Sequence, residues 1–73
     1  MKHTTKEQLA YLKECYMGKT IELLAMPDDP HPVPIGTKGF AHSIDDAGQI
    51  CVNWENGSTL NIILEAGDRI KVL

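Results

Sequence analysis

Residues 49–64 read QICVNWENGSTLNIIL and contain the clearest structural signal in the chain. Two runs in which apolar residues alternate with polar ones flank the step Asn56-Gly57. This step is the strongest short-range signal for a β-hairpin, because both residues tolerate the positive φ of a tight turn. We therefore expect a strand at 49–54, a turn at 55–58 and a second strand at 59–64.

The same alternation extends on both sides of this hairpin. Residues 39–44 form an earlier strand, for which two arrangements are open. Either Phe40, His42 and Ile44 share one face, or a bulge lets Ala41 and Ile44 both point inward.

Two further strands complete the pattern, one at 19–26 and one containing Ile70 and Val72, preceded by a turn or single helical turn at 65–68. Five short strands separated by one long early loop and one short late turn are typical of a small SH3-like barrel. The predicted fold is mainly β: a five-stranded SH3-like barrel with an N-terminal α-helix.

The helix is predicted at 4–16, where apolar residues recur every three to four positions. A capping box fits its start in two ways, Thr4 with Glu7 or Thr5 with Gln8. Gly18 is a natural stop, because glycine adopts the left-handed conformation that ends many helices. Residues 1–17 are thus the helical segment and 18–73 the barrel. The apolar face of so short a helix needs a partner, either its own barrel or a second copy of the chain.

The longest irregular segment contains all four prolines of the chain, in PDDPHPVPIG at 27–36. Proline excludes a helix or central strand here and favours an extended excursion. An exposed loop of this kind is the obvious candidate for a binding surface.

Composition limits the function. The chain has 73 residues and a net charge of −3, and its seven basic residues are scattered, which argues against nonspecific binding of nucleic acid. We see no apolar run of the roughly 20 residues that a membrane span needs and no secretory signal, so we expect a cytoplasmic protein with Cys15 and Cys51 reduced.

No catalytic signature stands out, and the chain is predicted not to be an enzyme. Gly36-Thr37-Lys38-Gly39 opens a strand, whereas a phosphate-binding loop of the Walker type opens a helix. A carboxylate site from Asp28-Asp29 and Asp45-Asp46, or a zinc site from His31, His42 and Cys51, lacks supporting spacing. We expect neither a metal nor a cofactor.

A longer combined pattern covers nearly the whole chain. It consists of Gly18-x-x-Ile21-x-Leu23-x-x-Met26-x-Asp28-Asp29-Pro30, Pro34-x-Gly36-Thr37-x-Gly39, and Ile44-Asp45-Asp46-x-Gly48-x-Ile50-x-Val52-x-Trp54-x-Asn56-Gly57-Ser58-x-Leu60. This pattern resembles a small bacterial family, domain of unknown function 4314, carried by low-GC bacteria, their conjugative elements and prophages. The resemblance implies an accessory protein of a mobile element with an SH3-like barrel. It implies no catalytic residues.

Three functions remain open. The first is a non-enzymatic binding module of a phage or mobile genetic element that engages a host or element protein through loop 27–35 and the barrel rim. Its predicted contact residues are Asp28, Asp29, His31, Trp54 and Asn56, although core packing is the other interpretation of Trp54.

The second function is a homo-oligomer, assembled through the N-terminal helix, that sequesters a small molecule or nucleotide as an anti-defence protein. Lys19, Lys38 and Arg69 would then contact phosphate. The third is an SH3-like domain that binds RNA or DNA. A membrane partner is not expected.

Overall fold

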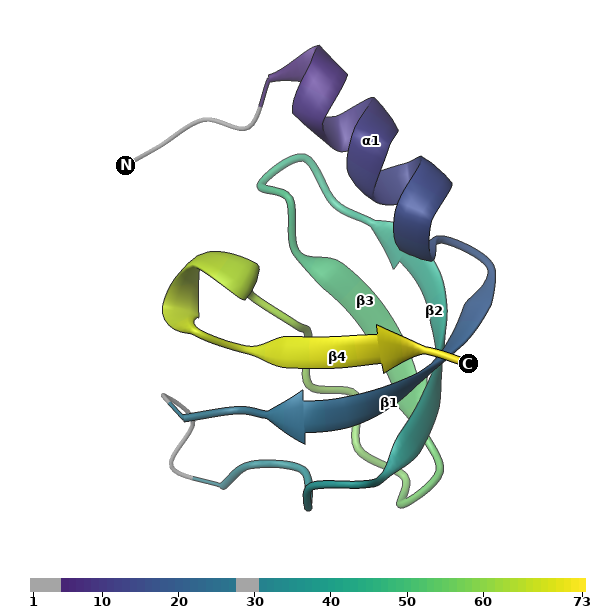
Figure 1. The fold of residues 1–73 in the computed structure, drawn as a ribbon, viewed down its shortest axis with the longest axis vertical. Coiled ribbons are helices and arrows are strands. Elements are labelled where there is room, and N and C mark those ends of the chain that lie inside the picture. Colours follow the sequence, from purple (N-terminus) through teal and green to yellow (C-terminus); the bar gives the residue numbers. More distant parts are fainter. Residues whose placement is uncertain (1–4, 28–30) are drawn as a thin grey trace.

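A computed structural model describes residues 5–27 and 31–73 and arranges them as one helix and one antiparallel sheet (Figure 1). The sheet has four strands in the order β3-β2-β1-β4. The elements in chain order are α1 (Lys6–Tyr16), β1 (Lys19–Ala25), β2 (Lys38–Ile44), β3 (Ile50–Trp54), the 3₁₀ helix η1 (Leu64–Ala66) and β4 (Arg69–Val72). The predictions of a mainly β domain and an N-terminal helix are confirmed.

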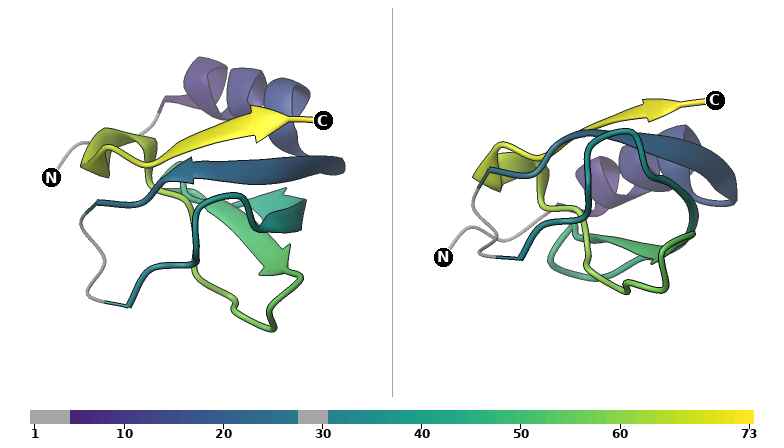
Figure 2. Two further views of the ribbon diagram at one scale, coloured as in Figure 1. Left: turned by 60° about the horizontal axis from the view of Figure 1, so that its bottom comes forward. Right: turned by 90° about the horizontal axis from the view of Figure 1, so that it is seen from below.

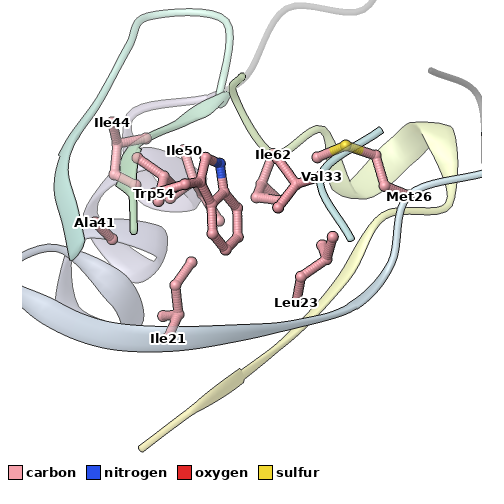
Figure 3. Packing of buried hydrophobic residues seen from close by; sticks show 10 residues of the cluster. Ile21, Leu23, Met26, Val33, Ala41, Ile44, Ile50, Trp54 and Ile62 are labelled. Carbon is pink, nitrogen blue, oxygen red and sulfur yellow. The ribbon is translucent and has the colours of Figure 1, made fainter. Parts of the chain in front are cut away.

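The sheet curls, so that β1 and β4 cross over β2 and β3 with the core between them (Figure 2). Trp54 lies near the middle of this core (Figure 3). Ten buried apolar residues form the cluster: Ile21, Leu23, Met26, Val33, Ala41, Ile44, Ile50, Val52, Trp54 and Ile62. They come from β1, β2, β3 and two loop segments, whereas β4 adds only the half-buried Ile70, which packs against the cluster.

A β-bulge in β2 decides which of its side chains point inward. The register with β3 shifts between Ala41 and Ser43. Ala41 and Ile44 are both buried, whereas Phe40 and His42 are exposed. The second of the two arrangements expected for this strand is therefore correct.

The strand predicted at 59–64 is not part of the sheet in the described structure, which has four strands where we expected five. Among the described residues, the backbone of this segment pairs with the β3 backbone at one isolated bridge, where Ile50 and Ile62 exchange two hydrogen bonds of 2.8 and 2.9 Å. Side chains form hydrogen bonds with other backbone groups of the segment. The Leu60 N–H donates to the Ser58 hydroxyl, and the Leu60 carbonyl accepts from the Trp54 indole. Local bonds of this type compete with a strand ladder.

The sheet is accordingly open and not a closed barrel. Its two edge strands, β3 and β4, do not pair with each other. The turn expected at 65–68 contains η1, which ends at Gly67 with φ of 95°.

Helix α1 begins with the second of the two expected capping boxes. The Gln8 N–H donates to the Thr5 hydroxyl at 3.1 Å, and the Thr5 N–H donates to the Gln8 side-chain oxygen at 3.0 Å. The helix packs against the core of its own chain through three half-buried side chains, Leu9, Leu12 and Tyr16. No residue of α1 is fully buried, so its attachment to the sheet is shallow.

The proline-containing loop is fixed to the core where the structure describes it. Met26 and Val33 are buried, while Pro32 and Pro34 are exposed. At its far end, the Gly36 N–H donates to the Leu23 carbonyl at 2.8 Å.

Candidate binding groove

The structure describes three of the five residues predicted to form a protein-contact surface. Asp28 and Asp29 lie outside the described residues. His31 and Asn56 are exposed, in two different loops. Trp54 is only 4 % exposed, and its indole N–H donates to the Leu60 carbonyl at 2.9 Å. Its packing in the core is the interpretation that the structure supports.

The three cations predicted to contact phosphate also lie apart. The Lys19 ammonium donates to the Glu14 carbonyl at 2.9 Å, at the end of α1. Arg69 pairs with Ala25 at the opposite end of β1, roughly 20 Å away at about 3.3 Å per residue. Its guanidinium donates to the carbonyls of Leu64 and Asp68. One phosphate group therefore cannot reach both cations.

Lys38 and Trp54 do meet, at a shallow hollow of about 250 Å³ on the sheet. The hollow includes Phe40, which is 46 % exposed although it stands on a central strand. Asn53, paired with Phe40 across β2 and β3, also lines it. The apolar surface here is small, and Glu55 beside Lys38 offsets its charge.

A larger groove lies between α1, the β2–β3 turn and η1, and we call it the α1–η1 groove. Its volume is about 570 Å³, within the range of ligand-binding pockets. The residues that line it are Glu7, Gln8, Tyr11 and Leu12 of α1, Ala47, Gly48 and Gln49 of the turn, and Ile63, Leu64 and Glu65 around η1. Figure 1 shows the three segments that supply them.

Local structure holds each wall of the α1–η1 groove. Glu7, Gln8, Tyr11 and Leu12 share one helix face, because residues three and four apart are neighbours on a helix. In the turn, the Asp45 carboxylate accepts from the N–H groups of Ala47 and Gln49 at 3.0 and 2.8 Å. At η1, buried Asp68 accepts from the Ile63 N–H at 2.8 Å and so fixes the start of that wall.

The polar amides of the groove are already paired. Gln8 belongs to the capping box, and Gln49 accepts from the Asn61 side chain at 3.1 Å. The groove therefore offers mainly the apolar surface of Tyr11 and Ile63, which are 65 % and 39 % exposed. Among the described residues that line it, the charged ones are two carboxylates, Glu7 and Glu65. An occupant would be selected by shape and by positive charge.

Tyr11 has one further polar contact. A hydrogen bond with the Cys15 side chain, one helical turn away, raises the pKa of the Tyr11 hydroxyl above its ordinary value of 10.0. Both cysteines are free and half-buried. The hydroxyl therefore stays protonated at neutral pH.

Sequence reasoning missed the α1–η1 groove, although two signals for it were present. In the run Ile62-Ile63-Leu64, strand alternation leaves the middle residue facing outward. Tyr11 stands beside the packed face of the helix, not within it. Neither signal indicates that the two residues share a groove, because they are far apart in the chain. The buried role of Asp68 had no signal beyond its position in a turn.

Residues 5–27 and 31–73 contain no group of three or more His, Cys, Asp or Glu side chains placed to hold a metal ion. No helix among them is long and apolar enough to cross a membrane.

Comparison with known proteins places the chain in a family. The model of the family described as Domain of unknown function (DUF4314) matches residues 5–73. Neither the curated proteins nor the solved structures provide a match. Because the family model spans nearly the whole sequence, from the first residue before α1 to the last residue after β4, the chain belongs to the DUF4314 family.

Proposed function

We propose that this chain is a non-enzymatic binding module that engages a protein partner through the α1–η1 groove. The observation that carries the proposal is the exposed apolar lining of a concave site in a 73-residue domain. Large apolar side chains left in contact with water at a groove mark interaction sites more often than isolated ones do. Two such residues, Tyr11 and Ile63, stand on opposite walls.

The partner is a segment that inserts a bulky apolar side chain and carries Lys or Arg on either side of it. Apolar anchors in pockets supply most of the binding energy in protein interfaces. Glu7 and Glu65 line the groove, and none of its lining residues within 5–27 and 31–73 is a cation. The net charge of −3 also favours the approach of a basic partner. A second copy of this acidic chain fits this site less well.

An SH3-like arrangement is part of the proposal. The strand order β3-β2-β1-β4, the bridge between Ile50 and Ile62, and the position of η1 before the last strand support it. In this interpretation residues 59–63 take the place of a fifth strand. The origin in a phage or mobile element and the cytoplasmic location stay predictions, as does a contact role for loop 27–35.

Binding of a nucleotide is the weaker candidate. Its proposed phosphate contacts do not converge, because Lys19 and Arg69 stand at opposite ends of β1 and donate to backbone carbonyls. The proposed oligomer would need the apolar face of α1. Leu9, Leu12 and Tyr16 instead pack on their own chain.

Selection from a random peptide library displayed on phage tests the proposed function. We expect enriched peptides to combine an aromatic or aliphatic residue with flanking Lys or Arg. In ¹⁵N-labelled protein, they should shift the amide resonances of Glu7 to Leu12 and of Ile63 to Glu65. Enriched peptides that shift only resonances around Phe40, or a selection without enrichment, would refute the proposal.

Matched variants then locate the binding energy. Replacing Tyr11 or Ile63 by Ser removes an apolar wall and should weaken binding about 30-fold each if both are anchors worth about 2 kcal/mol. Phe40→Ser is the control, since it removes a large apolar side chain whose exposure lies between those of Tyr11 and Ile63 but which stands outside the groove. For the charges, Glu7→Gln with Glu65→Gln should weaken binding and its salt dependence. Glu14→Gln, on the same helix outside the groove, should not.

A further inference from the structure

The outer side of β4 is an open edge of the sheet. The Leu73 N–H donates to the Thr20 carbonyl at 3.0 Å. Successive residues of an antiparallel strand direct their N–H and C=O groups to opposite sides, so Lys71 and Leu73 bond to β1. The N–H and C=O groups of Ile70 and Val72 therefore point away from β1. No described residue pairs with them there, and β4 is the last strand of the sheet (Figure 1).

Side chains along this edge alternate in chemistry. Ile70 packs against the core, and Val72, on the same face, is 41 % exposed. Lys71 stands on the opposite face and is exposed. Glu22 is its neighbour on β1, yet no ion pair joins the two side chains within residues 5–27 and 31–73. An added strand would meet apolar surface on one face and a free ammonium on the other.

Pairing of two β4 edges with each other is disfavoured. In the antiparallel register that uses Ile70 and Val72 of both copies, Lys71 of one copy stands opposite Lys71 of the other. A shift toward Ile70 sets Lys71 opposite Arg69. Like charges directly opposite each other destabilise a strand pair, and lysine on an edge is a common device against self-association.

We propose that the β4 edge is a second binding site, which adds an extended segment of a partner protein as a fifth strand of the sheet. The segment has apolar residues opposite Ile70 and Val72, and Asp or Glu opposite Lys71. Backbone hydrogen bonds to the free groups of the edge supply affinity, and the alternating side chains supply selectivity. This site lies outside the α1–η1 groove and differs from it in the charge it selects.

Three short synthetic peptides test the site on the full chain: one of alternating Val and Glu, one of Val and Lys, and one of Val and Ser. Titration is followed by the amide resonances of the ¹⁵N-labelled protein. We expect the acidic peptide to bind tightest and to shift Ile70 and Val72. Each opposed charge pair should change affinity by about two- to five-fold. Equal binding of the acidic and basic peptides, or shifts confined to other strands, would overturn the proposal.

Two variants separate the edge from a general electrostatic effect. Of the backbone hydrogen-bonding groups, Val72→Pro removes one outward N–H, a loss that an edge strand tolerates. It also replaces the valine side chain, and it should weaken binding of the acidic peptide at least about five-fold, as one lost hydrogen bond does. Val72→Thr keeps the donor and the branched shape, and should bind as the original chain does. Lys71→Glu should reverse the order of the acidic and basic peptides.

The controls cover misfolding and self-association. Fluorescence of the single tryptophan, Trp54, reports whether each variant keeps its core. If Val72→Pro fails to fold, the proposal is tested by Lys71→Glu alone, in which the order of affinity for the acidic and basic peptides should reverse. A dimer in sedimentation that Lys71→Glu weakens or strengthens would show that a second copy occupies this edge, contrary to the proposal.

Discussion

Gly39→Ala should destabilise the domain, because the added methyl has no room in the core. Gly39 pairs with Trp54 across β2 and β3, on the buried face. A Cβ built at this position lies 2.6 Å from Val52 Cγ1, 2.8 Å from Trp54 Cε3 and 3.0 Å from the Asn53 carbonyl oxygen. All three distances are below ordinary contact, and one of the atoms is backbone.

The loss of folding free energy depends on whether the neighbouring side chains can move away from the added methyl group. Val52 and Trp54 are 1 % and 4 % exposed, so neither can leave without shifting the core. Extra methyl groups in a packed core cost about 1–3 kcal/mol. Alanine also restricts the unfolded chain, which stabilises by about 0.4–1 kcal/mol and works in the opposite direction. A net loss of about 1–2 kcal/mol should lower Tm by about 4–15 °C in a domain of this size.

Urea unfolding followed by Trp54 fluorescence measures this loss directly, because the chain has one tryptophan. The Val52→Ala background supplies the decisive control. It removes the atom nearest to the new methyl, so Gly39→Ala should cost less in that background. Coupling of about 0.5 kcal/mol or more is expected for residues in contact. A Gly39→Ala chain as stable as the original, or strict additivity with Val52→Ala, would refute the steric explanation.

Other substitutions test the walls of the groove. Asp68→Ala leaves the Ile63 N–H without its acceptor and should cost about 1–3 kcal/mol in urea unfolding, whereas an unchanged midpoint would mean that water replaces the carboxylate. Thr5→Ala removes the capping box and should destabilise α1 by about 0.5–2 kcal/mol, seen as faster amide exchange in α1 but not in the sheet. Cys15→Ala removes the contact that raises the Tyr11 pKa, so the NMR titration midpoint of Tyr11 should fall. A raised tyrosine pKa stabilises the folded state only while the hydroxyl is protonated. In the original chain this stabilisation should therefore disappear as the pH rises through the Tyr11 pKa.

Local signals in the sequence were enough for most of the fold. A turn does form at Asn56-Gly57, although only Gly57, with φ of 88°, takes the positive φ that we expected of both residues, and the Asn56 side chain accepts from the Ser58 N–H at 3.0 Å. Alternation correctly placed Ile50 and Val52 in the core. These features depend on neighbours in the chain, and such neighbours are visible in a sequence.

The prediction of a fifth strand was wrong for a reason that the alternation of apolar and polar residues cannot reveal. Residues 59–63 have the right pattern, and Ile62 is buried as a strand residue would be. Their backbone groups, however, bond to side chains of Ser58, Trp54 and Asp68. Trp54 and Asp68 reach the segment only in the folded chain. The β propensity of the segment therefore predicted a strand, but tertiary hydrogen bonds take the place of strand pairing.

A contact role for Asp28, Asp29, His31 and Asn56 stays a prediction, and polar residues in turns are a weak signal of a binding site. Turn residues such as Asp and Asn are common in loops because they bond to nearby backbone, which is what Asn56 and Asp45 do here. Their polarity therefore carries little information about ligands. The groove instead arises where a helix, a turn and a 3₁₀ helix meet, and no local pattern describes that meeting.

The position of the groove also determines how binding and stability are linked. One wall belongs to α1, an 11-residue helix without a fully buried side chain, and a helix of this length is marginal by itself. The other walls belong to the turn and to η1, which Asp45 and Asp68 hold from within the sheet domain. A segment that contacts both Tyr11 and Ile63 must therefore hold the helix to the sheet while it is bound. Affinity at the groove and the protection of α1 amides from exchange should change together. A variant that destabilises α1 without changing a residue of the groove should therefore also weaken binding.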